Sequence, residues 1–63
     1  MSRKYPNNQT ILEQFKQTFP EHKDDEILVE EDDDGPVVVV YSEDVYTFDV
    51  IVRDKSISFQ WLS

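Results

Sequence analysis

The side chains of this sequence that could do chemistry are almost all carboxylates. Fourteen Asp and Glu residues stand against six Lys and Arg, and nine of the fourteen fall between Glu21 and Asp34. Paired carboxylates act as general acid and base when their surroundings push their pKa values apart, which requires a buried or shifted pair. These acids lie in consecutive polar runs that are typical of solvated segments. The sequence therefore gives carboxylate catalysis little support.

Other catalytic and ligand-binding groups are scarce. The chain has no cysteine, one glycine, Gly35, and one histidine, His22. Thiolate zinc sites, histidine-rich metal sites and glycine-rich phosphate loops are therefore excluded. His22 is the only possible imidazole base, and its polar neighbours indicate an exposed residue near the end of a helix. We predict a protein that is not an enzyme and that holds no cofactor and no metal.

One acidic run resembles the opening of a calcium-binding loop. Glu30, Asp32 and Asp34 alternate before Gly35, as acids do before the glycine of an EF-hand. The twelfth position would be Tyr41 instead of the bidentate Glu that closes such a site. The flanking residues favour strands, not helices. A solvated hairpin turn is the better interpretation of this run.

A helix is expected near the start of the chain, where apolar residues recur at helical spacing: Ile11, Leu12, Phe15 and Phe19. Its N-terminus can be capped by Asn7 or Asn8, and a capping box that starts at Thr10 is an alternative. Pro20 cannot continue the helix. The predicted helix therefore covers residues 8–19.

After the helix the apolar period changes from 3.6 to 2, which predicts strands. Four runs fit: residues 26–31, 37–42, 45–52 and 56–62. Turns are expected at 32–36, where Asp34-Gly35 supplies a positive φ, at Glu43-Asp44 and at 53–55. Because these connections are short, sequential strands should be neighbours. The predicted fold class is α+β, with one N-terminal helix packed on a four-stranded antiparallel β-meander (α-β-β-β-β).

The chain is short enough to be one domain, residues 1–63, of which 1–6 are expected to form a loose tail. A domain of this size has little core, and without cysteine it cannot add disulfides. Self-association is then the remaining source of stability. The first residues contain no apolar stretch of a signal peptide, and no apolar run approaches the ~20 residues of a membrane span. We expect a cytoplasmic protein with no membrane contact.

The second predicted strand is apolar on both faces, although one helix covers only one face of a sheet. We expect a further apolar patch on the opposite face, made of Leu28, Val38, Val40 and Ile51. The last strand, 56–62, is uncharged and should form an edge, which invites pairing with another chain. Both features favour a homodimer or a partner surface. In the alternative, the N-terminal tail covers Val38 and Val40.

The net charge of −8 repels nucleic acids and anionic membranes. Direct DNA or RNA binding is therefore not expected. Carboxylates on a small rigid domain can instead imitate the charge density of a duplex and occupy a nucleic-acid-binding protein. The candidate partner-binding residues are Asp24, Asp25, Glu30, Glu31, Asp32, Asp33, Asp34, Glu43 and Asp44.

Small acidic inhibitors encoded by phages and mobile elements act in this way, and the likeness to them is one of composition and size. We therefore expect a protein-interaction module of inhibitor type, whose partner is another protein. Three alternatives remain open. The first is a small assembly subunit that uses its apolar face or strand edge, and the second is an antitoxin or immunity-type protein. In the third, the acidic surface serves only solubility.

Overall fold

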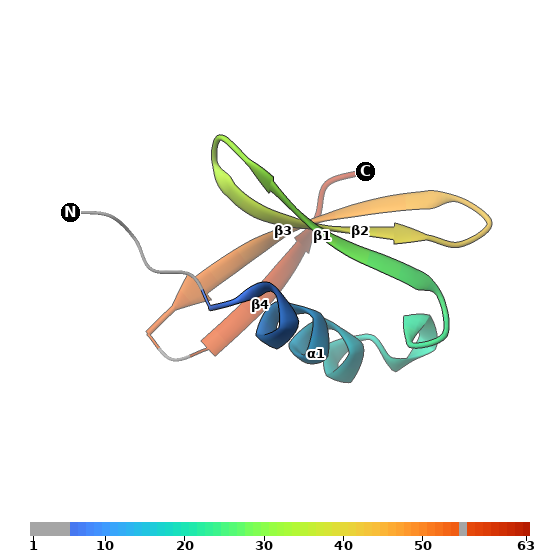
Figure 1. Cartoon of the computed structure of the whole chain (residues 1–63), viewed down its shortest axis with the longest axis horizontal. Coiled ribbons are helices and arrows are strands. Elements are labelled where there is room, and N and C mark those ends of the chain that lie inside the picture. The colour runs from blue at the N-terminus through green and yellow to red at the C-terminus, as the bar shows by residue number, and fades with distance from the viewer. Residues whose placement is uncertain (1–5, 55) are drawn as a thin grey trace.

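The computed structural model describes residues 6–54 and 56–63, and within them one helix and one 3-10 turn precede four strands (Figure 1). The elements are α1 (Asn8–Thr18), η1 (Pro20–His22), β1 (Glu26–Asp32), β2 (Gly35–Tyr41), β3 (Val45–Arg53) and β4 (Ser56–Trp61). The sheet has the order β1-β2-β3-β4, and every neighbouring pair is antiparallel. The predicted α-β-β-β-β arrangement is confirmed. Of the tail expected over residues 1–6, only Pro6 belongs to the described residues.

Helix α1 begins and ends where local chemistry requires. Asn7 is the cap, because its Oδ1 accepts a hydrogen bond of 2.8 Å from the backbone N–H of Thr10. The helix stops at Thr18, one residue earlier than expected. Phe19 adopts φ −126° and ψ 73° because Pro20 disfavours helical dihedrals in the residue before it. Within residues 6–54 and 56–63, no helix combines the length and the apolar composition that crossing a membrane needs.

The core lies between α1 and one face of the twisted sheet (Figure 1). Its buried residues are Ile11, Phe15, Ile27, Val38, Val40, Phe48 and Val50. Phe15 is central, since its ring meets the rings of Phe48 and Phe59 with centroids 5.0 Å away in both cases. The helix contacts the two outer strands, β1 and β4. One helix thus holds both edges of a four-stranded sheet.

The orientation of β2 differs from the expected one. Val38 and Val40 point toward α1 and are 0% exposed, so they are core residues. The cause is the turn after β2. A two-residue turn at Glu43-Asp44 would pair Ser42 with Val45, but the structure pairs Tyr41 with Val45 and leaves three residues in the turn. A shift of one residue moves every side chain of a strand to the other face.

The first hairpin turn also differs in detail from the sequence pattern. Its two turn residues are Asp33 and Asp34, and Asp32 pairs with Gly35 across it. Among the described residues the only positive φ values are those of Asp54, at 51°, and Gly35, at 119°. The glycine therefore supplies the positive φ directly after the turn, not within it. The outcome is a tight acidic tip on the β1–β2 hairpin.

Candidate functional site

The acids of the β1–β2 hairpin form the first part of the candidate site, and we call them the hairpin acids: Glu30, Glu31, Asp32, Asp33 and Asp34. All five are exposed. They occupy the C-terminal end of β1, which is one edge of the sheet, and the turn that follows it. Five consecutive carboxylates on an exposed edge and turn give this end of the molecule a concentrated negative charge.

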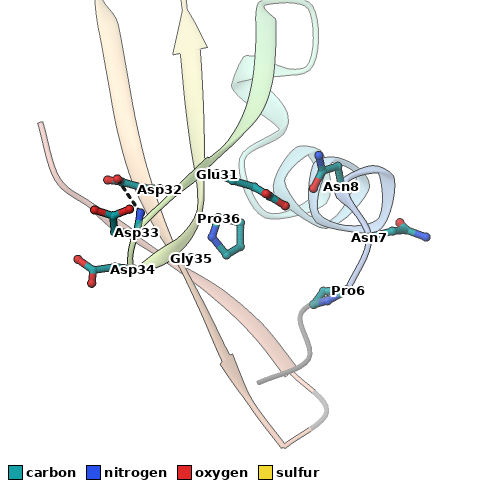
Figure 2. Close-up of a pocket in the computed structure, with 9 residues that line it drawn as sticks. All are labelled: Pro6, Asn7, Asn8, Glu31, Asp32, Asp33, Asp34, Gly35 and Pro36. Atoms are coloured by element: carbon teal, nitrogen blue, oxygen red, sulfur yellow. Dashed lines mark hydrogen bonds between the residues drawn. The ribbon is translucent and has the colours of Figure 1, made fainter. Parts of the chain in front are cut away.

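The hairpin acids do not all point the same way. Side chains alternate along β1, so Glu31 shares the helix-facing side with Ile27 and Val29. Figure 2 shows the Glu31 carboxylate directed toward Asn8 at the start of α1, with Asp33 and Asp34 directed away from the helix. A carboxylate near the positive end of a helix stabilises that helix. Glu31 therefore faces the start of α1, unlike Asp33 and Asp34 (Figure 2).

A shallow groove of about 830 Å³ separates the hairpin from the start of the helix (Figure 2). One side of it is lined by Pro6, Asn7 and Asn8, and the other by all hairpin acids except Glu30, together with Gly35 and Pro36. The other lining residues are proline, asparagine and glycine, so the carboxylates are the only charged groups that line the groove. Such a groove can accept the side chain of a Lys or Arg from another molecule.

A second acidic group lies at the other end of the sheet, and we call its members the loop acids: Asp24, Asp25, Glu26, Glu43 and Asp44. The β1–β2 and β2–β3 turns lie at opposite ends in Figure 1, and Glu26 pairs with Tyr41 just before the second of these turns. Glu26 was missing from the predicted set. It is exposed and follows Asp24-Asp25 directly, which is the signal that would have included it.

Not every candidate acid is equally available. Asp25 Oδ2 lies 2.9 Å from His22 Nδ1, in the one close contact between a carboxylate and a basic side chain among residues 6–54 and 56–63. Asp32 Oδ1 accepts a hydrogen bond of 2.8 Å from the backbone N–H of Asp33 and so holds the turn. The exposed acids of the two groups that have no such contact and do not face the helix are Asp24, Glu26, Glu30, Asp33, Asp34, Glu43 and Asp44. These seven are the stronger partner-binding candidates.

The geometry adds no support for metal or acid–base chemistry in the part of the chain that is described. No group of three or more His, Asp or Glu side chains there is arranged to hold a metal ion. His22 lies just after the helix, as expected, but its ring is half-buried beside Phe15 and Tyr46 and not exposed. The burial follows from η1, which turns the chain back toward the core.

The predicted self-association patch is divided between the two faces of the sheet. Val38 and Val40 lie beneath α1, so the prediction that they belong to a patch on the face opposite the helix is wrong. Leu28, 42% exposed, and Ile51 lie on the other side, which we call the open face. Other apolar residues of the open face are Val37, Val39, Tyr41 and Val45. The apolar face exists, but with different residues, because the register of β2 is shifted by one.

The β4 edge has the opposite character to the β1 edge. It contains no charged residue from Ser56 to Trp61, and the strand order places it at the edge, as predicted. Trp61 is 63% exposed and Leu62 beside it is also exposed. The sheet is therefore electrostatically asymmetric, with one acidic edge and one neutral edge.

Comparison with known proteins gives no match to a family model, to a curated protein or to a solved structure. The two acidic groups and the neutral edge are thus the features from which a function can be inferred.

Proposed function

We propose that this chain is a non-catalytic cytoplasmic protein that inhibits a nucleic-acid-binding protein. Its acidic groups would occupy the basic groove of that partner. The observation that carries the proposal is the exposure of the hairpin acids, and of the loop acids other than Asp25, near the two ends of the edge strand β1. Within the described residues, the contact of Asp25 with His22 is the one close contact between a carboxylate and a basic side chain. Charge that is exposed and uncompensated is available to attract a basic surface.

The spacing of the two acidic groups supports imitation of a nucleic acid. Glu26 and Glu30 are four residues apart in β1, which corresponds to about 13 Å along an extended strand. One strand of a duplex carries a charge about every 3.4 Å of axis, so 13 Å corresponds to roughly four phosphate steps. A groove that follows a nucleic-acid backbone with two clusters of Lys and Arg would meet both acidic groups at once.

Rigid display of the charges also supports a role in binding. The hairpin acids lie on a β-hairpin whose other strand is held in the sheet by β3. Carboxylates on a fixed scaffold lose less conformational freedom on binding than those on a loose chain, and more of the electrostatic attraction remains as affinity.

The proposal is tested by capture from a nuclease-treated lysate with stepwise salt elution and mass spectrometry. We expect a nucleic-acid-binding protein that elutes at modest salt and is displaced by added DNA or RNA. A triple variant, Glu30→Gln, Asp33→Asn and Asp34→Asn, should lose this protein. It leaves unchanged Asp32, which accepts the hydrogen bond in the turn, and Glu31, which is directed toward the helix (Figure 2).

The matched control is the triple variant Glu13→Gln, Glu21→Gln and Asp54→Asn, which removes the same number of exposed charges elsewhere. It should retain the partner. Equal retention by both variants, or an affinity that does not change from low to high salt, would contradict the proposal.

A second candidate function is that of a small assembly subunit, and the open face favours it. Leu28, Tyr41 and Val45 are large apolar side chains that remain exposed there. A partner bound to this face would be held by apolar contacts and would survive high salt. Leu28→Lys should release such a partner, whereas the hairpin triple variant should not.

A further inference from the structure

The outer side of β4 carries backbone groups that no strand in the described residues satisfies. Leu62 N–H donates to the carbonyl of Thr47 at 2.7 Å, which fixes the alternation of the β3–β4 ladder. In an antiparallel ladder every second residue directs its N–H and C=O to the neighbouring strand. The N–H and C=O groups of Ile57, Phe59 and Trp61 therefore point away from β3, toward the free edge.

The two edges of the sheet differ in what they allow to approach. The β1 edge bears Glu26 and the hairpin acids, and charged side chains are a common protection of edge strands. The β4 edge has no charge and no proline, and it is built from Ser, Ile, Phe, Gln and Trp. Trp61 is 63% exposed at its end. The protection against edge pairing is thus present on one edge of this sheet and missing from the other.

We propose that a second copy of this chain pairs antiparallel with β4, so that two sheets join into one of eight strands. Twofold pairing of the outward backbone groups sets Phe59 opposite the partner's Phe59 and Ile57 opposite the partner's Trp61. On the open face it sets Ser58 opposite the partner's Gln60. In this register no charge faces another charge, and aromatic and β-branched residues form the cross-strand pairs that stabilise sheets.

The distribution of charge favours contact with a second copy through the β4 edge over contact through the open face. In the joined sheet the two β1 edges lie on the outside, separated by seven strand spacings or about 34 Å. This exceeds the Debye length of about 8 Å at physiological ionic strength, so repulsion between the acids of the two β1 edges is screened. The open face itself bears the carboxylates of Glu30 and Asp49, which a second copy bound there would have to cover. The inference does not depend on the proposed function.

The interface is small, so a concentration-dependent monomer–dimer equilibrium is expected. Sedimentation equilibrium over micromolar to submillimolar concentrations of the wild-type chain measures it. The variant Ser58→Lys with Gln60→Lys places like charges opposite each other across the interface, at the closely spaced non-hydrogen-bonded pairs. It should weaken dimerisation by about tenfold or more. Its monomer should fold, because Gln60 lies opposite Asp49 of its own sheet.

The control variant is Gln9→Lys with Gln17→Lys, which makes the same change in charge on exposed positions of α1. It should dimerise at least as well as the wild type. Mixing the Ser58→Lys/Gln60→Lys chain with a Ser58→Glu chain should restore a dimer, now mixed, because the introduced carboxylate lies opposite the lysine introduced at position 60. The acidic chain keeps Gln60, which lies opposite Asp49 of its own sheet, and Ser58 lies opposite the uncharged Ile51. A wild-type chain that stays monomeric, or a Ser58→Lys/Gln60→Lys variant that dimerises as tightly as the control, would overturn the proposal.

Discussion

Phe15 of α1 meets Phe59 of β4 edge to face, with ring centroids 5.0 Å apart and ring planes at 86°. The same Phe15 ring meets Phe48 of β3 at 5.0 Å and Phe19 of its own helix segment at 4.9 Å. Edge-to-face pairs at this distance are favourable beyond the area they bury. One side chain thus joins the helix to β3 and β4, and the position of the β4 edge depends on it.

Phe15→Ala should remove this junction and lower the free energy of unfolding by about 3–5 kcal/mol. A domain of this size has little stability in excess, so we expect a largely unfolded chain at 25 °C. Phe15→Leu keeps most of the volume and should cost about 1 kcal/mol. Urea unfolding followed by circular dichroism measures both variants. A fully folded Phe15→Ala chain would mean that the cluster is not the centre of the core.

Substitutions on the two faces of the sheet should have very different effects on stability. The side chain of Val38 is fully buried, so Val38→Lys places a charge in the core and the domain should unfold. Leu28→Lys lies on the open face, and its free energy of unfolding should change by less than about 1 kcal/mol. Thermal unfolding of the two variants side by side is the test. If Val38→Lys folds normally, the assigned register of β2 is wrong.

The same pair of residues shows what the sequence could and could not predict. Alternation in 45–52 and 56–62 identified the inward faces of β3 and β4, and helical spacing identified the buried stripe of α1. The run Val37 to Tyr41 has no alternation, so its facing depends on the length of the turn that follows it. Two residues or three in that turn are equally compatible with Ser42-Glu43-Asp44, and they give opposite faces.

The candidate site likewise has features that the sequence could predict and features that it could not. The acids and their exposure were predictable because charge runs next to turn residues remain solvated. Their separation into two groups at opposite ends of β1 follows from the strand pairing, and composition alone does not contain it. The roles of Glu31, Asp25 and Asp32 depend on side-chain directions and contacts within the fold. The neutral edge was predictable because strand order follows chain order in a meander.

Asn7→Ala should lower the free energy of unfolding by about 1 kcal/mol. The reason is the 2.8 Å hydrogen bond from Thr10 N–H to Asn7 Oδ1, which satisfies one of the free donors at the start of α1. Asn8→Ala is the matched control, since Asn8 is the first residue of the helix and is exposed. It should be neutral or slightly stabilising, because alanine favours the helix. Equal losses from both variants would contradict capping by Asn7 alone.

His22 holds the junction between η1 and β1 by packing more than by its ion pair. Its ring lies 6.4 Å from Phe15 at an interplanar angle of 22° and 5.9 Å from Tyr46, measured between centroids. Its contact with Asp25 is partly exposed, and such pairs contribute little. Asp25→Ala should therefore cost less than about 1 kcal/mol, whereas His22→Ala should cost about 1–2 kcal/mol.

The double variant separates these two contributions. If packing dominates, His22→Ala with Asp25→Ala should cost little more than His22→Ala alone, with a coupling energy below about 1 kcal/mol. Urea unfolding at neutral pH of the wild type, both single variants and the double variant gives the four values required. An Asp25→Ala variant as unstable as His22→Ala would show that the contact between Nδ1 and the carboxylate, and not the ring, fixes the junction.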